Sequence, residues 1–127
     1  VEGEMPAIAS VYHNRLRIGM PLQADPTIQY IIPEGPRRLL LRDLEIPSPY
    51  NTYLYPGLPP GPINNPGKKA LLATLFPAES PYLYFVADGT GRHRFSTTLA
   101  QHLQAKKGLD TLRRRLAREQ KGRHTRG

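Results

Sequence analysis

The sequence predicts an α+β fold, in which several short helices accompany a small antiparallel β-hairpin and a long loop rich in proline and glycine. Three observations predict it. Apolar residues recur at helical spacing near the N-terminus, two strand-like stretches flank the turn sequence DGTG at 88–91, and residues 50–67 read YNTYLYPGLPPGPINNPG. The first pattern is typical of a helix and the second of a hairpin, whereas the third contains too much proline and glycine for either.

The first predicted helix spans residues 6–17. It starts at a proline, which suits the first helical position, and it ends before Gly19. Its apolar stripe consists of Ile8, Val11, Tyr12 and Leu16, and off this stripe lie His13, Asn14 and Arg17. Residues 1–5 are expected to be the end of a loop, and the start of the chain at Val1 suggests a fragment or a processed product.

Two dipeptides predict further helix starts. Asp25-Pro26 and Asn65-Pro66 each place a capping side chain before a proline, so helices are expected from Asp25 to about 32 and over 66–76. The first of these segments contains enough β-branched residues that a strand is an alternative. One helical turn is expected at 42–45, before Pro47.

The second half of the chain predicts a hairpin and two more helices. Residues 81–87 and 92–96 are the paired strands, and residues 88–91 are their turn. A helix over 99–107 is expected to be broken by Gly108, and a final basic helix is expected to fray into the last six residues. We divide the chain into a body, residues 1–105, and a basic C-terminal helix or tail, residues 106–127.

Composition limits the possible classes of protein. A chain of 127 residues predicts one domain, and without cysteine it forms no disulfide and no thiolate metal site. No apolar run is long enough to span a membrane. The net charge is +8, but residues 106–127 hold nine basic and two acidic residues, so the tail carries +7 of it. Such a tail attracts nucleic acid, anionic lipid and anionic polymers alike.

The loop at 50–67 is the strongest functional candidate. Its five prolines restrict the backbone, while its three tyrosines and three asparagines offer flat faces and hydrogen-bonding groups. Long irregular loops in compact domains are usually functional or disordered, although a stiff structural connector is an alternative. The four histidines lack metal-ligand spacing, and no phosphate-binding or nucleophile motif occurs. A polar, aromatic groove for a sugar or peptide is therefore expected, with no metal and no cofactor.

Three blocks of sequence resemble the MltG/YceG family of endolytic murein transglycosylases: IASVYHNRLRIGMPLQADPTIQY at 8–30, the loop at 50–67, and YLYFVADGTGRHRFSTTLAQH at 82–102. The resemblance implies that residues 1–105 are the C-terminal part of the family's catalytic domain. It also implies cleavage of nascent peptidoglycan glycan strands to leave 1,6-anhydro-muramyl ends. The expected location is the extracytoplasmic face of the bacterial cytoplasmic membrane, reached through an anchor outside these residues, with the cell-wall synthesis machinery as a further partner.

The resemblance assigns substrate contacts residue by residue. The matching positions come from the first block, the loop and the second strand of the hairpin: Asn14, Gln23, Asp25, Thr27, Tyr30, Tyr50, Asn51, Tyr53, Pro59, Gly61, Asn65, His93 and Ser96, with Phe95 more typical of a core position. Asp25 and Asn65 are also plausible helix caps.

The general acid is expected outside this chain. Such a reaction needs one carboxylate that protonates the glycosidic oxygen and then helps the sugar's own 6-hydroxyl to attack. Aligning the family on Asn14-Arg15-Leu16 places that glutamate upstream of Val1, so that Glu2 and Glu4 fall in the connecting loop.

Two other functions remain open from the sequence. Similar chains have carried the label aminodeoxychorismate lyase, a pyridoxal-phosphate enzyme, which would need a Schiff-base lysine such as Lys68 or Lys69. A basic nucleic-acid-binding module is the non-enzymatic alternative. The nearly neutral body argues against it, and no specific nucleic acid is expected as a partner.

Overall fold

The computed structural model describes residues 2–35 and 37–125, with side chains placed for 3–35 and 37–119. It confirms the α+β class, and residues 46–67 form neither helix nor strand. In chain order the elements are η1 (Glu2–Glu4), α1 (Met5–Ile18), α2 (Asp25–Ile31), η2 (Leu41–Glu45), α3 (Lys68–Leu75), β1 (Tyr84–Ala87), β2 (His93–Ser96) and α4 (Leu99–Thr125).

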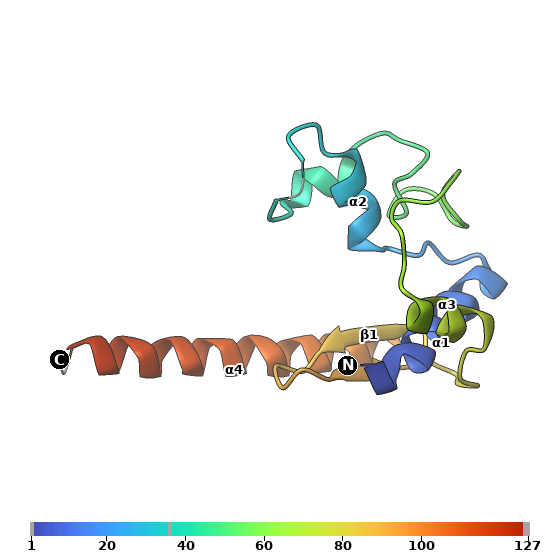
Figure 1. The fold of residues 1–127 in the computed structure, drawn as a ribbon. Coiled ribbons are helices and arrows are strands. Elements are labelled where there is room, and N and C mark those ends of the chain that lie inside the picture. Colours follow the sequence, from blue (N-terminus) through green and yellow to red (C-terminus); the bar gives the residue numbers. More distant parts are fainter. Residues whose placement is uncertain (1, 36, 126–127) are drawn as a thin grey trace.

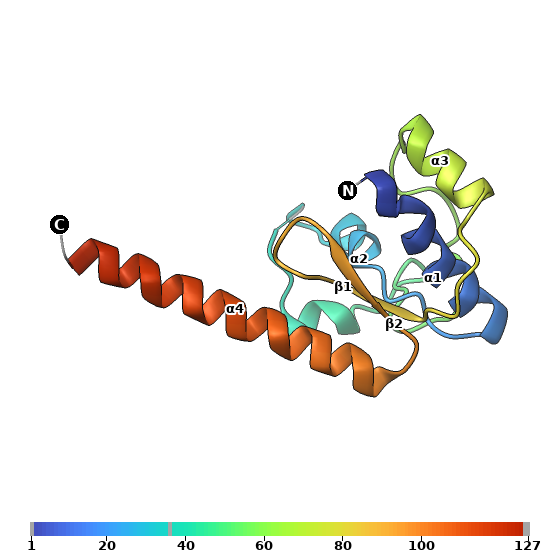
Figure 2. The same cartoon turned by 90° about the horizontal axis from the view of Figure 1, so that it is seen from below.

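The hairpin lies at the centre of one half of the molecule. β1 and β2 pair antiparallel, with Phe85 opposite Phe95 and Ala87 opposite His93. α1 and α3 pack together at one side of it, and α4 packs against both strands (Figures 1 and 2). η1 contacts α1, whereas α2 and η2 stand away from the hairpin together with the proline-rich loop (Figure 1).

Polar side chains of α1 hold these parts in place. The Asn14 amide donates to the carbonyls of Ser80 and Tyr82, each at 2.8 Å. The Arg15 guanidinium donates to the Leu83 carbonyl on one side and to the carbonyls of residues 21 and 22 on the other. Both side chains are buried. Asn14 is predicted to lie off the apolar stripe of this helix, and the chain at 80–83 covers it there.

The beginnings of three helical segments differ from prediction. Residues 2–4 form a 3-10 turn leading directly into α1, so Glu4 is not in a loop. The N-cap of α2 is Ala24, because Asp25 is already helical. α3 begins at Lys68 with Gly67 as its N-cap, so Asn65 is not a cap. In both dipeptides a proline does precede or open the helix, but the N-cap residue is alanine or glycine and makes no side-chain capping bond.

α4 is one continuous helix, and the predicted break at Gly108 is wrong. Ala105 and Leu109 are buried on either side of the glycine, and a Cβ atom at Gly89 would lie only 2.8 Å from Leu112 Cδ2. Packing on the hairpin turn thus continues through the glycine and outweighs its cost of about 1 kcal/mol. The helix extends to Thr125 instead of fraying over the last six residues, of which 126 and 127 lie outside the described part.

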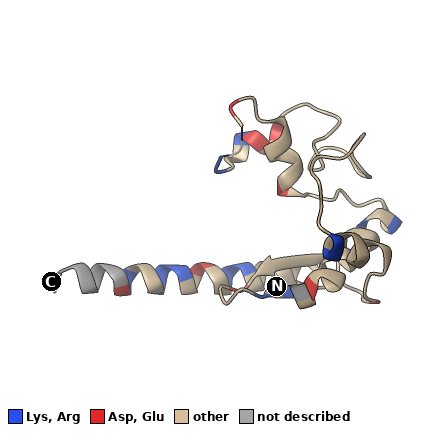
Figure 3. Ribbon diagram, in the orientation of Figure 1, with Lys and Arg blue, Asp and Glu red and all other residues tan. Residues whose placement is uncertain are grey.

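The far half of α4 protrudes from the body and carries its basic residues into solvent (Figures 1 and 3). Arg113, Arg114, Arg115 and Arg118 are all exposed. Among the described residues, no helix combines the length and apolar character needed to cross a membrane.

Candidate functional site

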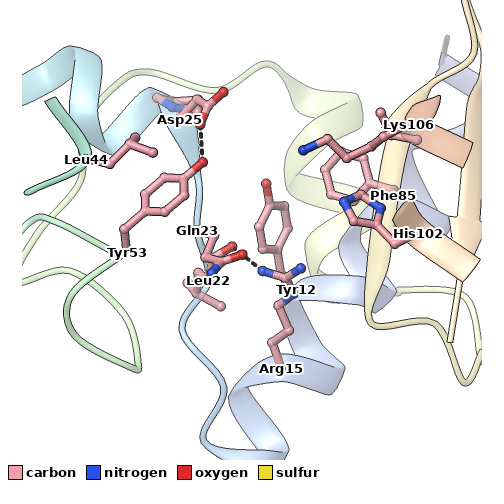
Figure 4. Close-up of a pocket in the computed structure, with 12 residues that line it drawn as sticks. Tyr12, Arg15, Leu22, Gln23, Asp25, Leu44, Tyr53, Phe85, His102 and Lys106 are labelled. Atoms are coloured by element: carbon pink, nitrogen blue, oxygen red, sulfur yellow. Dashed lines mark hydrogen bonds between the residues drawn. The ribbon is translucent and has the colours of Figure 1, made fainter. Parts of the chain in front are cut away.

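A cleft of about 580 Å³ lies between the two halves of the molecule. One wall comes from α1, β1 and α4, and the other from residues 22–26 and the proline-rich loop (Figure 4). Its volume falls within the range of about 300–1,000 Å³ that small-molecule sites occupy. The lining mixes aromatic and polar groups: Tyr12, Arg15, Leu22, Gln23, Asp25, Pro26, Leu44, Tyr53, Phe85, Val86, His102 and Lys106.

Asp25 and Tyr53 join within one wall of the cleft. The Tyr53 hydroxyl donates a hydrogen bond to the Asp25 carboxylate (Figure 4). Burial, together with this hydrogen bond and the charge of Asp25, raises the pKa of Tyr53 far above its usual value. The phenol therefore stays protonated and serves as a donor, which leaves Asp25 with an accepting oxygen for a ligand.

Gln23 reaches the cleft from a strained backbone. Its φ is +51°, in the left-handed region that non-glycine residues rarely adopt. Two bonds to Thr52 hold this conformation: the Gln23 N–H donates to the Thr52 carbonyl at 3.1 Å, and the Ala24 N–H donates to the Thr52 hydroxyl at 2.9 Å. Backbone strain of this kind gathers at functional sites, because only a surrounding framework can maintain it.

Three further predicted residues build that framework. Asn51 is fully buried, and its amide donates to the carbonyls of Leu44 and Ile46 while its oxygen accepts from the Tyr53 N–H. The Thr27 and Thr52 hydroxyls lie 2.9 Å apart in the interior. The Asn14 amide likewise donates to backbone carbonyls in the chain at 80–83. These side chains position the cleft, and their predicted contact with substrate stays a prediction.

The other predicted residues lie outside this cleft. Tyr30 and Tyr50 pack ring against ring, with centroids 5.0 Å apart. Pro59 and Gly61 line a second, more apolar cavity of about 670 Å³ between the loop, α1 and α3. Asn65 is exposed, and Ser96 is buried at the end of β2 beside Phe95, which stacks on Tyr82. Their roles as substrate contacts likewise stay predictions.

Glu4 and His93 form a separate polar contact. Both Glu4 carboxylate oxygens accept the His93 backbone N–H at 3.1 Å, and the nearer one lies 3.4 Å from the imidazole Nδ1. This contact attaches the N-terminal turn to the beginning of β2. His93 lines none of the cavities described above.

Sequence reasoning missed part of the cleft wall. Tyr12 belongs to the predicted apolar stripe of the first helix, and it does meet Phe85 edge to face at 5.8 Å. The division of the chain after residue 105 places Lys106 in the basic tail, although α4 carries it into the cleft. His102 stacks on Tyr84 at 5.0 Å. The hydroxyl of Tyr12 is the sequence signal that could have placed this residue in the cleft wall, since buried tyrosines usually direct that group toward a polar partner.

The structure also locates the residues that metal or pyridoxal-phosphate chemistry would use. No group of three potential metal-binding side chains occurs among the described residues. Lys68 and Lys69 are both exposed at the beginning of α3, outside the cleft.

Comparison with known proteins decides the family. A sequence model of the YceG-like family matches residues 1–108. The chain belongs to the YceG-like family. A Bacillus subtilis relative named endolytic murein transglycosylase is 50% identical over 99 residues, which are 78% of this chain and 28% of the relative. A Streptococcus pneumoniae protein of the same name is 40% identical over 88 residues, or 65% of this chain and 16% of its own length.

A solved YceG-like structure supports the fold. The crystal structure of a yceG-like protein from Listeria monocytogenes superimposes with a TM-score of 0.70 at 48% identity, covering 76% of this chain and 31% of that one. This chain thus spans less than a third of the length of these YceG-like relatives. The family match ends at residue 108, within α4, so the protruding half of that helix lies beyond it.

Proposed function

We propose that this chain is part of an endolytic murein transglycosylase and that the cleft between its two halves binds the glycan strand of peptidoglycan. The observation that carries the proposal is the lining of the cleft by tyrosines beside Gln23 and Asp25, in a chain 50% identical to a protein of that name. Tyrosine faces pack on sugar rings, while carboxylate and amide groups bond their hydroxyls. The proposed location is the bacterial cell envelope.

The proposed reaction is cleavage of the glycosidic bond by attack of the sugar's own 6-hydroxyl, leaving a 1,6-anhydro end. One carboxylate donates a proton to the leaving oxygen and then takes the proton of the 6-hydroxyl. We assign this carboxylate to a residue preceding Val1 in the whole protein. Within this chain, Asp25 accepts a hydrogen bond from Tyr53 and Glu4 is bonded to His93, so each already has a structural partner.

Residues of this chain would then bind and orient the strand. Tyr12 and Tyr53 would supply ring faces, and Gln23 would supply an amide held in one place by its strained backbone. The buried network around Asn51 would keep the loop wall rigid, which lowers the entropy lost on binding. The cell-wall synthesis machinery is the further partner that this proposal includes.

Co-sedimentation with purified peptidoglycan tests the binding. Gln23→Ala should weaken binding about fivefold or more, because one bonded amide contributes about 1 kcal/mol. Glu79→Gln, an exposed change away from the cleft, is the matched control and should leave binding unchanged. Equal binding by both variants would contradict the proposal.

The basic tail allows the nucleic-acid alternative to be tested separately. Truncation before Arg113 removes seven basic residues and one acidic residue but keeps Leu109 and Leu112, which pack on the body. Glycan binding should survive the truncation, and salt-sensitive binding to polyanions should vanish. Loss of glycan binding with the tail would favour a general polyanion-binding protein.

A further inference from the structure

The cleft wall formed by α1, β1 and α4 carries positive charge. Lys106 extends from α4 toward the opening, opposite Asp25 and Tyr53 (Figure 4). Within the part of the chain whose side chains are placed, the Lys106 ammonium makes no ion pair. Together with Arg15 it gives the lining two cations against one carboxylate, Asp25, which is already bonded to Tyr53.

His102 adds an unsatisfied polar atom to the same wall. Its Nδ1 is buried and has no hydrogen-bond partner among the described residues, while its ring is fixed by stacking on Tyr84 with 24° between the planes. Burial, followed by the positive charges of Lys106 and Arg15, lowers the pKa of His102. The imidazole is therefore neutral near pH 7, and one of its two nitrogens carries a hydrogen.

Arg15 has a different role from Lys106. Its Nε and Nη1 atoms donate to three backbone carbonyls, and its guanidinium lies 5.2 Å from the centre of the Tyr84 ring. These contacts hold the frame of the cleft together. The ammonium of Lys106 keeps its donors for a ligand, so the attraction of an anion falls mainly on Lys106, with His102 beside it.

We propose that His102 and Lys106 form a subsite for a carboxylate carried by the muramyl residues of the glycan strand. The inference rests on the proposed function and assigns one wall of its cleft. A muramyl residue bears a lactyl ether whose carboxyl group is either free or joined to a peptide that carries carboxylates of its own. Both sources present the same anion, and a neutral strand of N-acetylglucosamine presents none.

Lys106 and Lys107 form a matched pair for the test. They are adjacent on α4 and both exposed, but a helix turns by about 100° per residue and only Lys106 lines the cleft. Replacing either with alanine removes the same charge from the same helix. Neither side chain is buried, so both variants should fold, which circular dichroism checks.

The experiment measures the affinity of the full 127-residue chain for three soluble ligands. These are peptide-bearing glycan fragments, amidase-treated strands with free lactyl carboxylates, and chitooligosaccharides without carboxylates. Lys106→Ala should weaken binding of a carboxylated ligand about five- to tenfold, as expected for a partly exposed charge-assisted bond. It should leave chitooligosaccharide binding within twofold, and Lys107→Ala should leave all three within twofold.

The remaining outcomes separate the subsite from the function. A loss confined to peptide-bearing fragments assigns the carboxylate to the peptide, and a loss confined to amidase-treated strands assigns it to the lactyl group. Equal losses in the two lysine variants, or an equal loss for chitooligosaccharides, overturn the subsite while glycan binding stands. A wild-type chain that binds none of the three ligands overturns the proposed function and the subsite with it.

Discussion

The hydroxyl of Tyr53 donates to the carboxylate of Asp25 and thereby joins the proline-rich loop to the first turn of α2 (Figure 4). The two residues are 28 positions apart in the sequence, so this bond closes one wall of the cleft over a long connection. Burial is the main reason why the pKa of Tyr53 is raised, and the bond raises it further, because ionisation would break the bond and place a second negative charge beside Asp25.

Tyr53→Phe should loosen this wall. Loss of the hydrogen bond should lower the free energy of unfolding by about 1 kcal/mol and weaken glycan binding. Asp25→Asn keeps an accepting oxygen and should lose less stability, which thermal unfolding of the two variants compares. In an alkaline titration, the raised pKa means that wild type and Tyr53→Phe should release the same number of tyrosine protons near pH ~10. One proton fewer in the variant would contradict the assigned environment.

Asn51→Ala should be among the most destabilising single changes in the loop. Its amide satisfies the carbonyls of Leu44 and Ile46 and the N–H of Tyr53, all of which lose their partner on truncation. We expect a loss of about 2–4 kcal/mol in the free energy of unfolding, measured by denaturant titration. Asn65→Ala is the control, because this asparagine is exposed and should change stability by less than about 0.5 kcal/mol. Similar losses in both would contradict the buried network.

Asp43 should make the fold sensitive to acid. The Arg37 guanidinium binds its two oxygens at 2.7 and 2.8 Å, and with the Leu40 N–H it lowers the Asp43 pKa from 3.8 to about 2. A lowered pKa means that the unfolded chain binds this proton first. The contribution is therefore complete above about pH 4 and is lost as the pH falls toward 2.

The corresponding measurement is thermal unfolding between about pH 6 and 2. Asp43→Asn should be less stable than wild type at neutral pH, and the difference should shrink on acidification. Glu34→Gln provides the control, because Glu34 is largely exposed and meets Arg37 only at 3.9 Å. An exposed pair of this kind contributes little, so its removal should leave the pH profile unchanged. A constant difference between wild type and Asp43→Asn would contradict the assigned pairing.

Glu4→Gln should preserve catalysis in the whole protein. The Glu4 carboxylate accepts the His93 N–H, and a glutamine oxygen can still do so, with a loss of about 1 kcal/mol in stability. Chromatography of digested glycan strands should still show anhydro ends at a comparable rate. If Glu4→Gln abolishes these products while unfolding is unchanged, then Glu4 is itself the acid and the assignment of that role to an upstream residue is wrong.

Local sequence patterns predicted those features of the fold that depend on residues close together in the chain. The spacing of apolar side chains located α1, and the turn at 88–91 located the hairpin, because both features are fixed within a few positions of the chain. Burial of Asn14 escaped prediction, since its partners are the carbonyls of Ser80 and Tyr82, more than 60 positions away. Nothing in a helical period shows that such a polar position will be covered.

The residues of the cleft likewise divide into those that the sequence located and those that it did not. Gln23, Asp25 and Tyr53 were assigned together through family resemblance, and the structure places all three around one cavity. Lys106 was not assigned, because its sequence neighbours are basic and it resembles the rest of the tail. Its position in the cleft depends on how α4 packs along the hairpin, a tertiary effect that the sequence around residue 106 does not show.

Gly108→Ala tests whether α4 continues through residue 108. Gly108 lies inside α4, its φ is not in the left-handed region, and a Cβ atom there would meet nothing within 4 Å. Alanine should therefore raise the free energy of unfolding by about 0.5–1 kcal/mol, because glycine loses more backbone freedom on folding. Gly91→Ala provides the contrast: its surroundings are equally open, but its φ of +89° should make alanine destabilising by about 1 kcal/mol or more. Destabilisation by Gly108→Ala would contradict a helix that continues through residue 108.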